Sequence, residues 1–230
     1  MIKNIFLDLD VTILDFQRGE RQAIKRTFEA IGVPSDPETI ERYIEINLSC
    51  WRALERGEMS REQVLYGRFE RLFAKLGVPG SGEQTQKLYQ RLLSEERDFI
   101  TVGKELLEAL NESGKYRLYL ATNGIPEVQH PRIKGSGIER YFSRIFISEE
   151  IGYPKPRREY FEACFSAIEG FKESETIIVG DSLTSDIQGG INAGILTCHF
   201  NPKNNPYRDI RPDFKINNLS ELPSLLDSIE

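Results

Sequence analysis

The chain has 230 residues, of which 39% are hydrophobic and 29% charged, an ordinary composition for a globular protein that can bury a core. Its net charge is −6 and no lysine- or arginine-rich tract stands out, so the electrostatic footprint of a nucleic-acid-binding protein is absent. Three cysteines without a CxxC spacing indicate neither a disulfide framework nor a zinc site, and two histidines argue against a multi-histidine metal centre.

The first predicted element is a short buried strand at residues 5–7, an apolar and β-prone run. Asp8 and Asp10 follow it, and residues two apart on a strand point the same way. We expect both acids at the carboxyl edge of a sheet, where open α/β sheets bind ligands. Two carboxylates this close repel each other unless a bound cation offsets their charge. The alternative is a strand end with two solvated acids.

Residues from about 16 to 97 show helical periodicity and no strand signal. Apolar residues recur at helical spacing in four stretches, and glycine and proline residues separate them. Ser60 and Gln63 have the spacing of a capping box at the start of the third stretch. We expect a small bundle of helices at 19–31, 40–54, 60–76 and 88–93.

Strands and helices alternate after residue 98, with Pro131 and Gly135 interrupting one helix. The predicted strands are 116–121, 144–147, 176–179, 196–200 and 214–216. The predicted helices are 104–113, 125–136, 157–168, 185–193 and 219–229. Such alternation implies a mainly parallel, Rossmann-like α/β sheet with helices on both faces. Residues 1–15 and 98–230 would form this domain, with the all-helical residues 16–97 inserted.

Four segments resemble the motifs of the haloacid dehalogenase-like (HAD) hydrolase superfamily and occur in its order. They are Asp8-Leu9-Asp10-Val11-Thr12, Thr122-Asn123-Gly124, Lys155-Pro156, and Gly180-Asp181-Ser182 followed by Asp186. The whole layout resembles members of the superfamily with a helical cap inserted after the first motif. Val11 is a departure, because many members carry a small or acidic residue there. We expect loop geometry or substrate access to change, and the chemistry to survive.

The resemblance implies a phosphatase in which Asp8 is the nucleophile and forms an aspartyl-phosphate. Asp10 would be the general acid for the leaving oxygen and then the base for the attacking water. Thr12 is expected to hydrogen-bond locally and shape the loop. For the phosphate, Thr122 would offer its hydroxyl and Asn123 a backbone N–H. Lys155 would place a positive charge on the phosphate and the nucleophile.

The same resemblance implies a Mg²⁺ ion held by the Asp8 carboxylate, the Asp10 carbonyl and the Asp181 carboxylate. Oxygen ligands with no cysteine or histidine nearby favour magnesium. Asp181 follows a predicted strand, which brings it to the same edge as Asp8. For Asp186 we expect a supporting role, orienting Lys155 or a metal-bound water, although a plain helix N-terminal charge is the alternative.

Within the superfamily, the motif segments most resemble pyrimidine 5′-nucleotidases that act on non-standard nucleotides. Phe16, Trp51 and Arg52 are candidates to contact a base, with packing in the core as the alternative. A phosphomutase, a sugar-phosphate phosphatase and a non-catalytic binding protein on the same fold stay open. The expected partner is a small-molecule phosphate monoester, with no nucleic acid polymer.

The expected location is the cytoplasm. The N-terminal apolar run is too short and too acidic for a signal peptide. No apolar stretch reaches the roughly 18 residues of a membrane span. The sequence does not reveal the oligomeric state.

Overall fold

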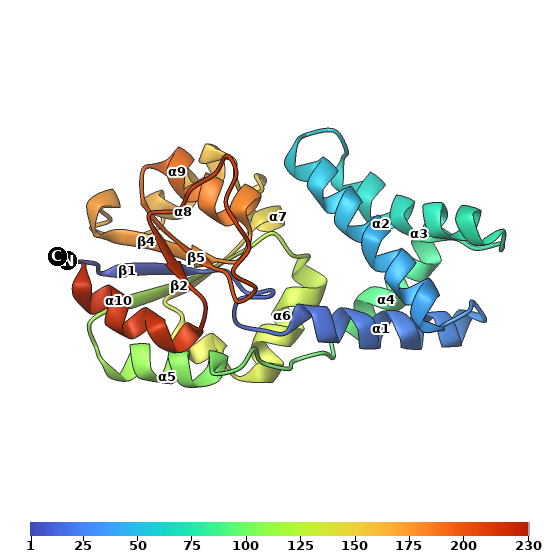
Figure 1. Ribbon diagram of the computed structural model, residues 1–230, viewed down its shortest axis with the longest axis horizontal. Helices are drawn as coiled ribbons and strands as arrows, with labels where there is room; N and C mark the ends of the chain where they lie inside the picture. The colour runs from blue at the N-terminus through green and yellow to red at the C-terminus, as the bar shows by residue number, and fades with distance from the viewer. Residues whose placement is uncertain (230) are drawn as a thin grey trace. The chain divides into compact units, whose positions relative to one another are not determined.

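The computed structural model describes residues 1–229, which form two compact units (Figure 1). The sheet unit contains residues 1–16 and the chain from Arg97 onward, and the helical unit contains residues 17–96. Assigning catalysis to residues 1–15 with 98–230, and a cap function to 16–97, stays a prediction. Among residues 1–229, no helix is both long and apolar enough to cross a membrane.

Within the described residues, six parallel strands form one sheet in the order β3-β2-β1-β4-β5-β6. They are β1 (Asn4–Leu7), β2 (Arg117–Thr122), β3 (Arg144–Ile147), β4 (Thr176–Gly180), β5 (Leu196–Phe200) and β6 (Phe214–Ile216). On the central strand, Leu7 lies opposite Leu120 of β2 and Val179 of β4. The chain adds strands outward on one side of β1 and then returns to its other side with β4. Ligands of open α/β sheets bind at such a reversal of strand order, outside the carboxyl ends of the strands.

Helices cover both faces of the sheet. All four residues of β1 are buried, and its apolar residues alternate between two cores, with Ile5 and Leu7 in one and Phe6 in the other. Figure 1 shows α5 and α10 on one side of the sheet and α8 and α9 on the other. The helices of this unit are α5 (Gly103–Glu112), α6 (Pro126–Ser136), α7 (Ser148–Ile151), α8 (Arg158–Ser166), α9 (Gln188–Ala193) and α10 (Leu222–Ser228). Short 3₁₀ turns lie at Glu139–Tyr141, Glu173–Glu175 and Leu219–Glu221, and a π-helical turn at Leu183–Ile187.

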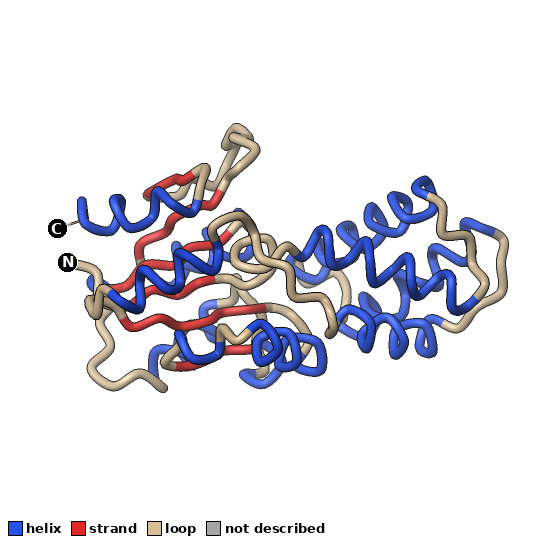
Figure 2. The backbone as a smooth tube through the Cα atoms, turned by 90° about the horizontal axis from the view of Figure 1, so that it is seen from below, coloured by secondary structure: helices blue, strands red, loops and turns tan. Residues whose placement is uncertain are grey.

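The helical unit consists of helices joined by loops along residues 17–96 (Figure 2). The helices are α1 (Phe16–Ile31), α2 (Pro37–Glu55), α3 (Arg61–Leu76) and α4 (Gly82–Leu93). The predicted capping box is confirmed, because the Gln63 N–H donates to Ser60 Oγ and the Ser60 N–H donates to Gln63 Oε1. The architecture confirms the predicted α/β class, with a Rossmann-like parallel sheet and an inserted all-helical domain.

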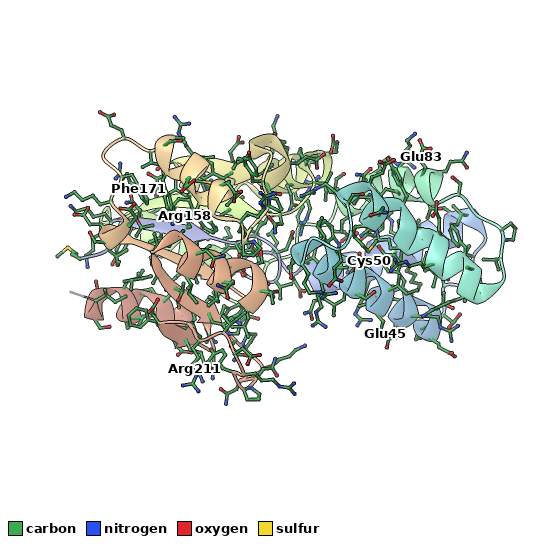
Figure 3. The ribbon with its side chains drawn as sticks, turned by 90° about the horizontal axis from the view of Figure 1, so that it is seen from above. Glu45, Cys50, Glu83, Arg158, Phe171 and Arg211 are labelled. Atoms are coloured by element: carbon green, nitrogen blue, oxygen red, sulfur yellow. The ribbon has the colours of Figure 1, made fainter. Side chains whose placement is uncertain are left out.

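Each helix of the helical unit buries one face, as the labelled residues of α2 in Figure 3 illustrate: Cys50 is buried and Glu45 is exposed. The buried faces of α2, α3 and α4 together form an aromatic cluster. The rings of Tyr43 and Phe69 stack at 5.2 Å, and Tyr89 meets Phe69 edge-on at 5.7 Å. Such pairs stabilise a core beyond the area that they bury.

A buried arginine packs against the three rings of this cluster. Arg68 is 2% exposed, and its guanidinium donates to Asn47 Oδ1 and to Gln86 Oε1, both at 2.6 Å. Asn47 in turn donates to Glu20 Oε1 at 2.5 Å. A buried charge is costly unless polar partners offset it, and Asn47 links the Arg68 guanidinium to the Glu20 carboxylate through two hydrogen bonds.

Two local predictions need correction. Helix α6 runs from Pro126 to Ser136 without an interruption at Pro131. Pro131 and Glu127, whose carbonyl would have accepted the missing N–H, are both exposed, so water can replace the lost bond. Helix α4 begins at Gly82, ahead of the start predicted at residue 88, because Ser81 caps it by accepting from the Gln84 N–H.

Candidate active site

Asp8 and Asp10 lie in a tight turn directly after β1. Asp8 continues the strand pairing, since its N–H donates to the Val179 carbonyl at 3.0 Å. The chain then turns back, and the Leu14 N–H donates to the Leu9 carbonyl at 2.9 Å. The turn therefore holds Asp8 at the carboxyl edge of the sheet, beside the point where the strand order reverses.

The backbone of Val11 explains how this turn closes. Val11 has a φ of +66°, in the left-handed region that β-branched residues rarely adopt, and its N–H donates to the Leu14 carbonyl at 2.9 Å. The expectation that Thr12 hydrogen-bonds locally is wrong. Its hydroxyl is buried and has no hydrogen-bond partner among the residues that the structure describes. Backbone bonds, and not the threonine side chain, shape the loop.

Lys155 precedes α8, and its ammonium group is buried beside Asp8. Its Nζ lies 2.7 Å from Asp8 Oδ1, 2.6 Å from Asp186 Oδ1 and 2.6 Å from the Ala121 carbonyl oxygen. Burial would lower the pKa of Lys155, but the attraction of Asp186 and Asp8 outweighs it and raises the pKa above its ordinary value. The lysine therefore stays charged, and its three N–H donors are directed at these three oxygens.

The side chain of Asn123, directly after β2, fixes the backbone of Lys155. Its Nδ2 donates to the Lys155 carbonyl at 2.9 Å, and its Oδ1 accepts from the Lys155 N–H at 2.9 Å. Nδ2 also lies 3.2 Å from Ser185 Oγ. The phosphate-binding role predicted for Asn123 concerns its backbone N–H and stays a prediction.

Three carboxylates gather at the ends of β1 and β4. Asp8, Asp181 and Asp186 each offer an oxygen within 4.8 Å of the others. Burial raises the pKa of Asp8 to about 7 against the attraction of Lys155, and burial together with the charges of Asp8 and Asp186 raises the pKa of Asp181. Asp186 also accepts from the Ser182 N–H at 3.1 Å, which orients it toward Lys155. Such a cluster of hard oxygen atoms suits a divalent cation.

His199, on β5, is a residue that the motif search missed. Its Nε2 lies 2.8 Å from the Asp181 carbonyl oxygen, so Nε2 carries the proton and donates it. Nδ1 then accepts from the Tyr207 hydroxyl at 3.0 Å. Burial lowers the pKa of His199, which keeps the ring neutral. The ring thus braces the backbone of Asp181, a role with no motif of its own.

Thr122, the last residue of β2, is tied into the site as an acceptor. Its Oγ1 accepts from the Gly124 N–H at 3.0 Å and from Gln129 Nε2 at 2.9 Å. Two donors occupy the hydroxyl oxygen, which leaves its own hydrogen to donate elsewhere. Gly124 allows the close approach, because a Cβ at this position would lie 2.0 Å from Gln129 Nε2.

The Asp10 carboxylate has two partners on α6 that the sequence analysis did not single out. Arg132 lies 2.6 Å from Asp10 Oδ1, and Gln129 Nε2 donates to Asp10 Oδ2 at 2.7 Å. The signal was a pair of polar residues at i and i+3 on a helix that follows the second motif. Alone, that spacing does not separate a buried site face from a solvated one.

The proposed base contacts stay untested. The Phe16 ring faces the Arg132 guanidinium at 5.7 Å, and the Trp51 ring faces Arg61 at the same distance. Arg52 is exposed on α2. Neither aromatic residue is fully buried, so each keeps accessible surface, although both already face an arginine of their own unit.

Known proteins resemble this chain over almost its whole length. The model of the haloacid dehalogenase-like hydrolase family matches residues 2–194. The HAD-hydrolase YfnB of Bacillus subtilis is 37% identical, over 98% of this chain and 95% of its own length. Pyrimidine 5′-nucleotidase PynA of Streptococcus pneumoniae is 34% identical over 98% of this chain and 95% of its own. Pyrimidine 5′-nucleotidase YjjG of Escherichia coli is 30% identical over 96% of each.

Among solved structures, the crystal structure of YfnB from Bacillus subtilis superposes with a TM-score of 0.94, covering 98% of this chain and 99% of that one. That structure is described as bound to magnesium and as revealing interdomain movement. The matches confirm the resemblance that the four motif segments predicted.

Proposed function

The chain belongs to the haloacid dehalogenase-like family of hydrolases, and we propose that it is a magnesium-dependent phosphatase that hydrolyses nucleoside 5′-monophosphates through an aspartyl-phosphate. The observation that carries the proposal is the contact of Lys155 Nζ with Asp8 Oδ1 at 2.7 Å, beside oxygens of Asp181 and Asp186. A carboxylate paired with a buried cation at the edge of a parallel sheet is suited to attack an anionic phosphoryl group.

In the first step, an Asp8 carboxylate oxygen attacks phosphorus and the bond from phosphorus to the ester oxygen breaks. Asp10 donates a proton to that oxygen, so the nucleoside leaves as an alcohol. The positive charge of Lys155 favours the ionised, nucleophilic form of Asp8. Phosphate-monoester hydrolysis has one of the highest uncatalysed barriers known, which is why both an activated nucleophile and a proton donor are needed.

In the second step, water attacks the aspartyl-phosphate and the bond from phosphorus to the Asp8 oxygen breaks. Asp10, now a carboxylate, accepts a proton from the attacking water. Inorganic phosphate leaves, and Asp8 and Asp10 return to their starting states. Covalent catalysis of this kind replaces one difficult displacement by two easier ones.

The residues present fit a magnesium ion. Their donors are oxygen atoms. Burial, and then the neighbouring carboxylates, raise the pKa values of Asp8 and Asp181, and a bound cation would favour the ionised form of both acids. The Asp8 carboxylate, the Asp10 carbonyl and the Asp181 carboxylate would hold it, and Asp186 would support the site through Lys155. When bound, the ion supplies charge neutralisation to the phosphoryl oxygens.

Phosphate binding would come from the end of β2 and from Lys155. The Thr122 hydroxyl has its hydrogen available, because its oxygen already accepts from Gly124 and Gln129. Backbone N–H groups of Asn123 and Gly124 belong to the turn after a buried strand, a setting that suits anions. These groups would orient the phosphoryl group toward Asp8.

The nucleotide class rests on the two relatives named as pyrimidine 5′-nucleotidases, each matched over almost the whole chain. Relatives at 26–27% identity carry other names, among them N-acylneuraminate-9-phosphatase, phosphoserine phosphatase and ribulose-1,5-bisphosphate 5-phosphatase. The substrate panel must therefore contain representatives of each.

The test measures inorganic phosphate released from thymidine, deoxyuridine and purine 5′-monophosphates, N-acylneuraminate 9-phosphate, phosphoserine and ribulose 1,5-bisphosphate. Each substrate is assayed with Mg²⁺ and with EDTA, on wild type, Asp8→Asn and the exposed-loop control Asp209→Asn. We expect Mg²⁺-dependent release that favours pyrimidine nucleotides, survives in Asp209→Asn and vanishes in Asp8→Asn.

Other outcomes overturn defined parts of the proposal. Release from a sugar phosphate in preference to nucleotides rejects the nucleotide class. Transfer of the phosphoryl group to a second sugar phosphate, without release, indicates a phosphomutase. No turnover of any substrate with Mg²⁺ indicates a binding protein, and full activity in Asp8→Asn removes Asp8 as the nucleophile.

A further inference from the structure

The Asp10 carboxylate is clamped at both oxygens by two residues of α6. Oδ1 accepts from Arg132 at 2.6 Å, and Oδ2 accepts from Gln129 Nε2 at 2.7 Å. Both partners are 1% exposed. A carboxylate offers about four lone-pair positions, so two bonds fix its plane and still leave positions for a proton in transit.

The orientation of the Gln129 amide is unambiguous, because its oxygen and its nitrogen have partners of opposite kinds. Oε1 accepts from Arg132 at 2.8 Å, whereas Nε2 donates to Asp10 and to Thr122 Oγ1. One amide therefore joins the proposed proton donor to a proposed phosphate ligand. The same Gln129 nitrogen lies 2.7 Å from Asp10 Oδ2 and 2.9 Å from Thr122 Oγ1, so it fixes both groups relative to each other.

Packing holds this arrangement in place. Gly124 lies so close to the Gln129 amide that any side chain there would displace it. The Arg132 guanidinium meets the Phe16 ring at 5.7 Å, which restricts its movement on another side. The pair of Arg132 and Asp10 is therefore held in one geometry, unlike an ion pair on the surface, which contributes little to stability.

We propose that Gln129 and Arg132 are positioning residues that hold the Asp10 carboxyl in the orientation for proton transfer to the leaving group. The inference rests on the proposed function. It assigns these residues no contact with substrate. They act through Asp10, and Gln129 also acts through Thr122.

The inference makes a prediction that depends on the leaving group. A misplaced acid slows the departure of a poor leaving group, which must be protonated, more than that of a stable anion. Phenyl phosphate has the poor leaving group, and 4-nitrophenyl phosphate releases the more stable anion. The parameter kcat/KM covers all steps through departure of the leaving group, and so excludes the later attack by water.

The experiment measures kcat/KM with Mg²⁺ for both aryl phosphates on wild type, Gln129→Met, Arg132→Met and Arg132→Lys. Methionine keeps approximate volume and removes the donors. We expect kcat/KM for phenyl phosphate to fall roughly 10- to 100-fold in the methionine variants, since general acid catalysis contributes about 10²–10⁴-fold in total. For 4-nitrophenyl phosphate we expect less than about a 3-fold fall, and Arg132→Lys should recover part of the loss.

Lys134→Met, an exposed change on the same helix, is the matched control and should leave both substrates unaffected. Equal falls for the two aryl phosphates, or none, overturn the inference. If a methionine variant fails to fold by circular dichroism, Arg132→Lys decides the matter through the same ratio. A wild type that releases phosphate from neither aryl phosphate nor nucleotides contradicts the proposed function instead, so the two failures are distinguishable.

Discussion

Replacing Lys155 by methionine tests whether one buried ammonium group is what allows two carboxylates to lie side by side. Methionine keeps an unbranched apolar stem of similar length. It removes the three donors that contact Asp8, Asp186 and the Ala121 carbonyl. The variant therefore leaves two acids and one backbone acceptor without their partner.

The expected cost follows from burial. The side chains of Lys155 and Asp186 are each 1% exposed and that of Asp8 is 10% exposed, so water cannot replace the lost contacts. Removing one member of a buried ion pair typically destabilises a protein by about 3–5 kcal/mol, because the other charge stays behind. Protonation of one acid would limit the loss, and we expect about 3 kcal/mol near neutral pH. That is a large share of a typical stability of roughly 5–15 kcal/mol.

The assay is urea unfolding followed by far-ultraviolet circular dichroism, in EDTA so that no divalent ion compensates the acids. Lys134→Met, on the exposed side of α6, should change the unfolding free energy by less than about 0.5 kcal/mol. Adding Asp186→Asn to Lys155→Met should regain part of the loss, since one unpaired charge is then gone. A loss below about 1 kcal/mol, or no gain in the double variant, would refute the reasoning.

Three further predictions concern stability. Burial raises the pKa of folded Asp8 from 3.8 to about 7, so the folded protein binds more protons than the unfolded one between these values. The Tm in EDTA should therefore fall as pH rises from about 4 to about 7, more in wild type than in Asp8→Asn, and equal profiles by calorimetry contradict this. Val11→Gly should raise the unfolding free energy by roughly 1 kcal/mol in urea, because glycine adopts a φ of +66° without strain, and a loss of stability speaks against the strain. Arg68→Met should cost about 2–4 kcal/mol, since its two amide partners lose a buried donor. The fluorescence of Trp51 in the same unit reports that unfolding, and an unchanged midpoint excludes a stabilising role for the arginine.

Much of the fold could be predicted because local and global signals agree. The run before Asp8 is apolar on both faces, as a central strand of a parallel sheet requires, and β1 pairs on both sides. Ser60 and Gln63 carry a capping signal that needs no tertiary context, and the structure has that cap. The continuity of α6 through Pro131 could not be predicted, because the cost of a proline depends on whether the carbonyl that it leaves unpaired is exposed, which the sequence alone does not reveal.

Some residues of the site could be predicted from the sequence and others could not. The strand ends near Asp8, Thr122 and Asp181 could be located, since parallel strands bring their carboxyl ends to one edge. Gln129, Arg132 and His199 could not, because a glutamine, an arginine or a histidine within a helix or strand has no signature until its neighbours are known. The positive φ of Val11 was equally hidden, since valine gives no local signal for a left-handed backbone.

The central claim is that Asp8 becomes covalently phosphorylated during turnover, and rapid acid quench tests it most directly. Wild type with Mg²⁺ and a pyrimidine 5′-monophosphate is quenched during the first turnover, digested and analysed by mass spectrometry. The account predicts a phosphoryl group on the peptide that contains Asp8. This modification should be absent in Asp8→Asn, and treatment of the wild-type peptide with hydroxylamine should remove it. Rapid formation of nucleoside with no phosphorylated peptide at any quench time, or phosphorylation at another residue, would contradict it.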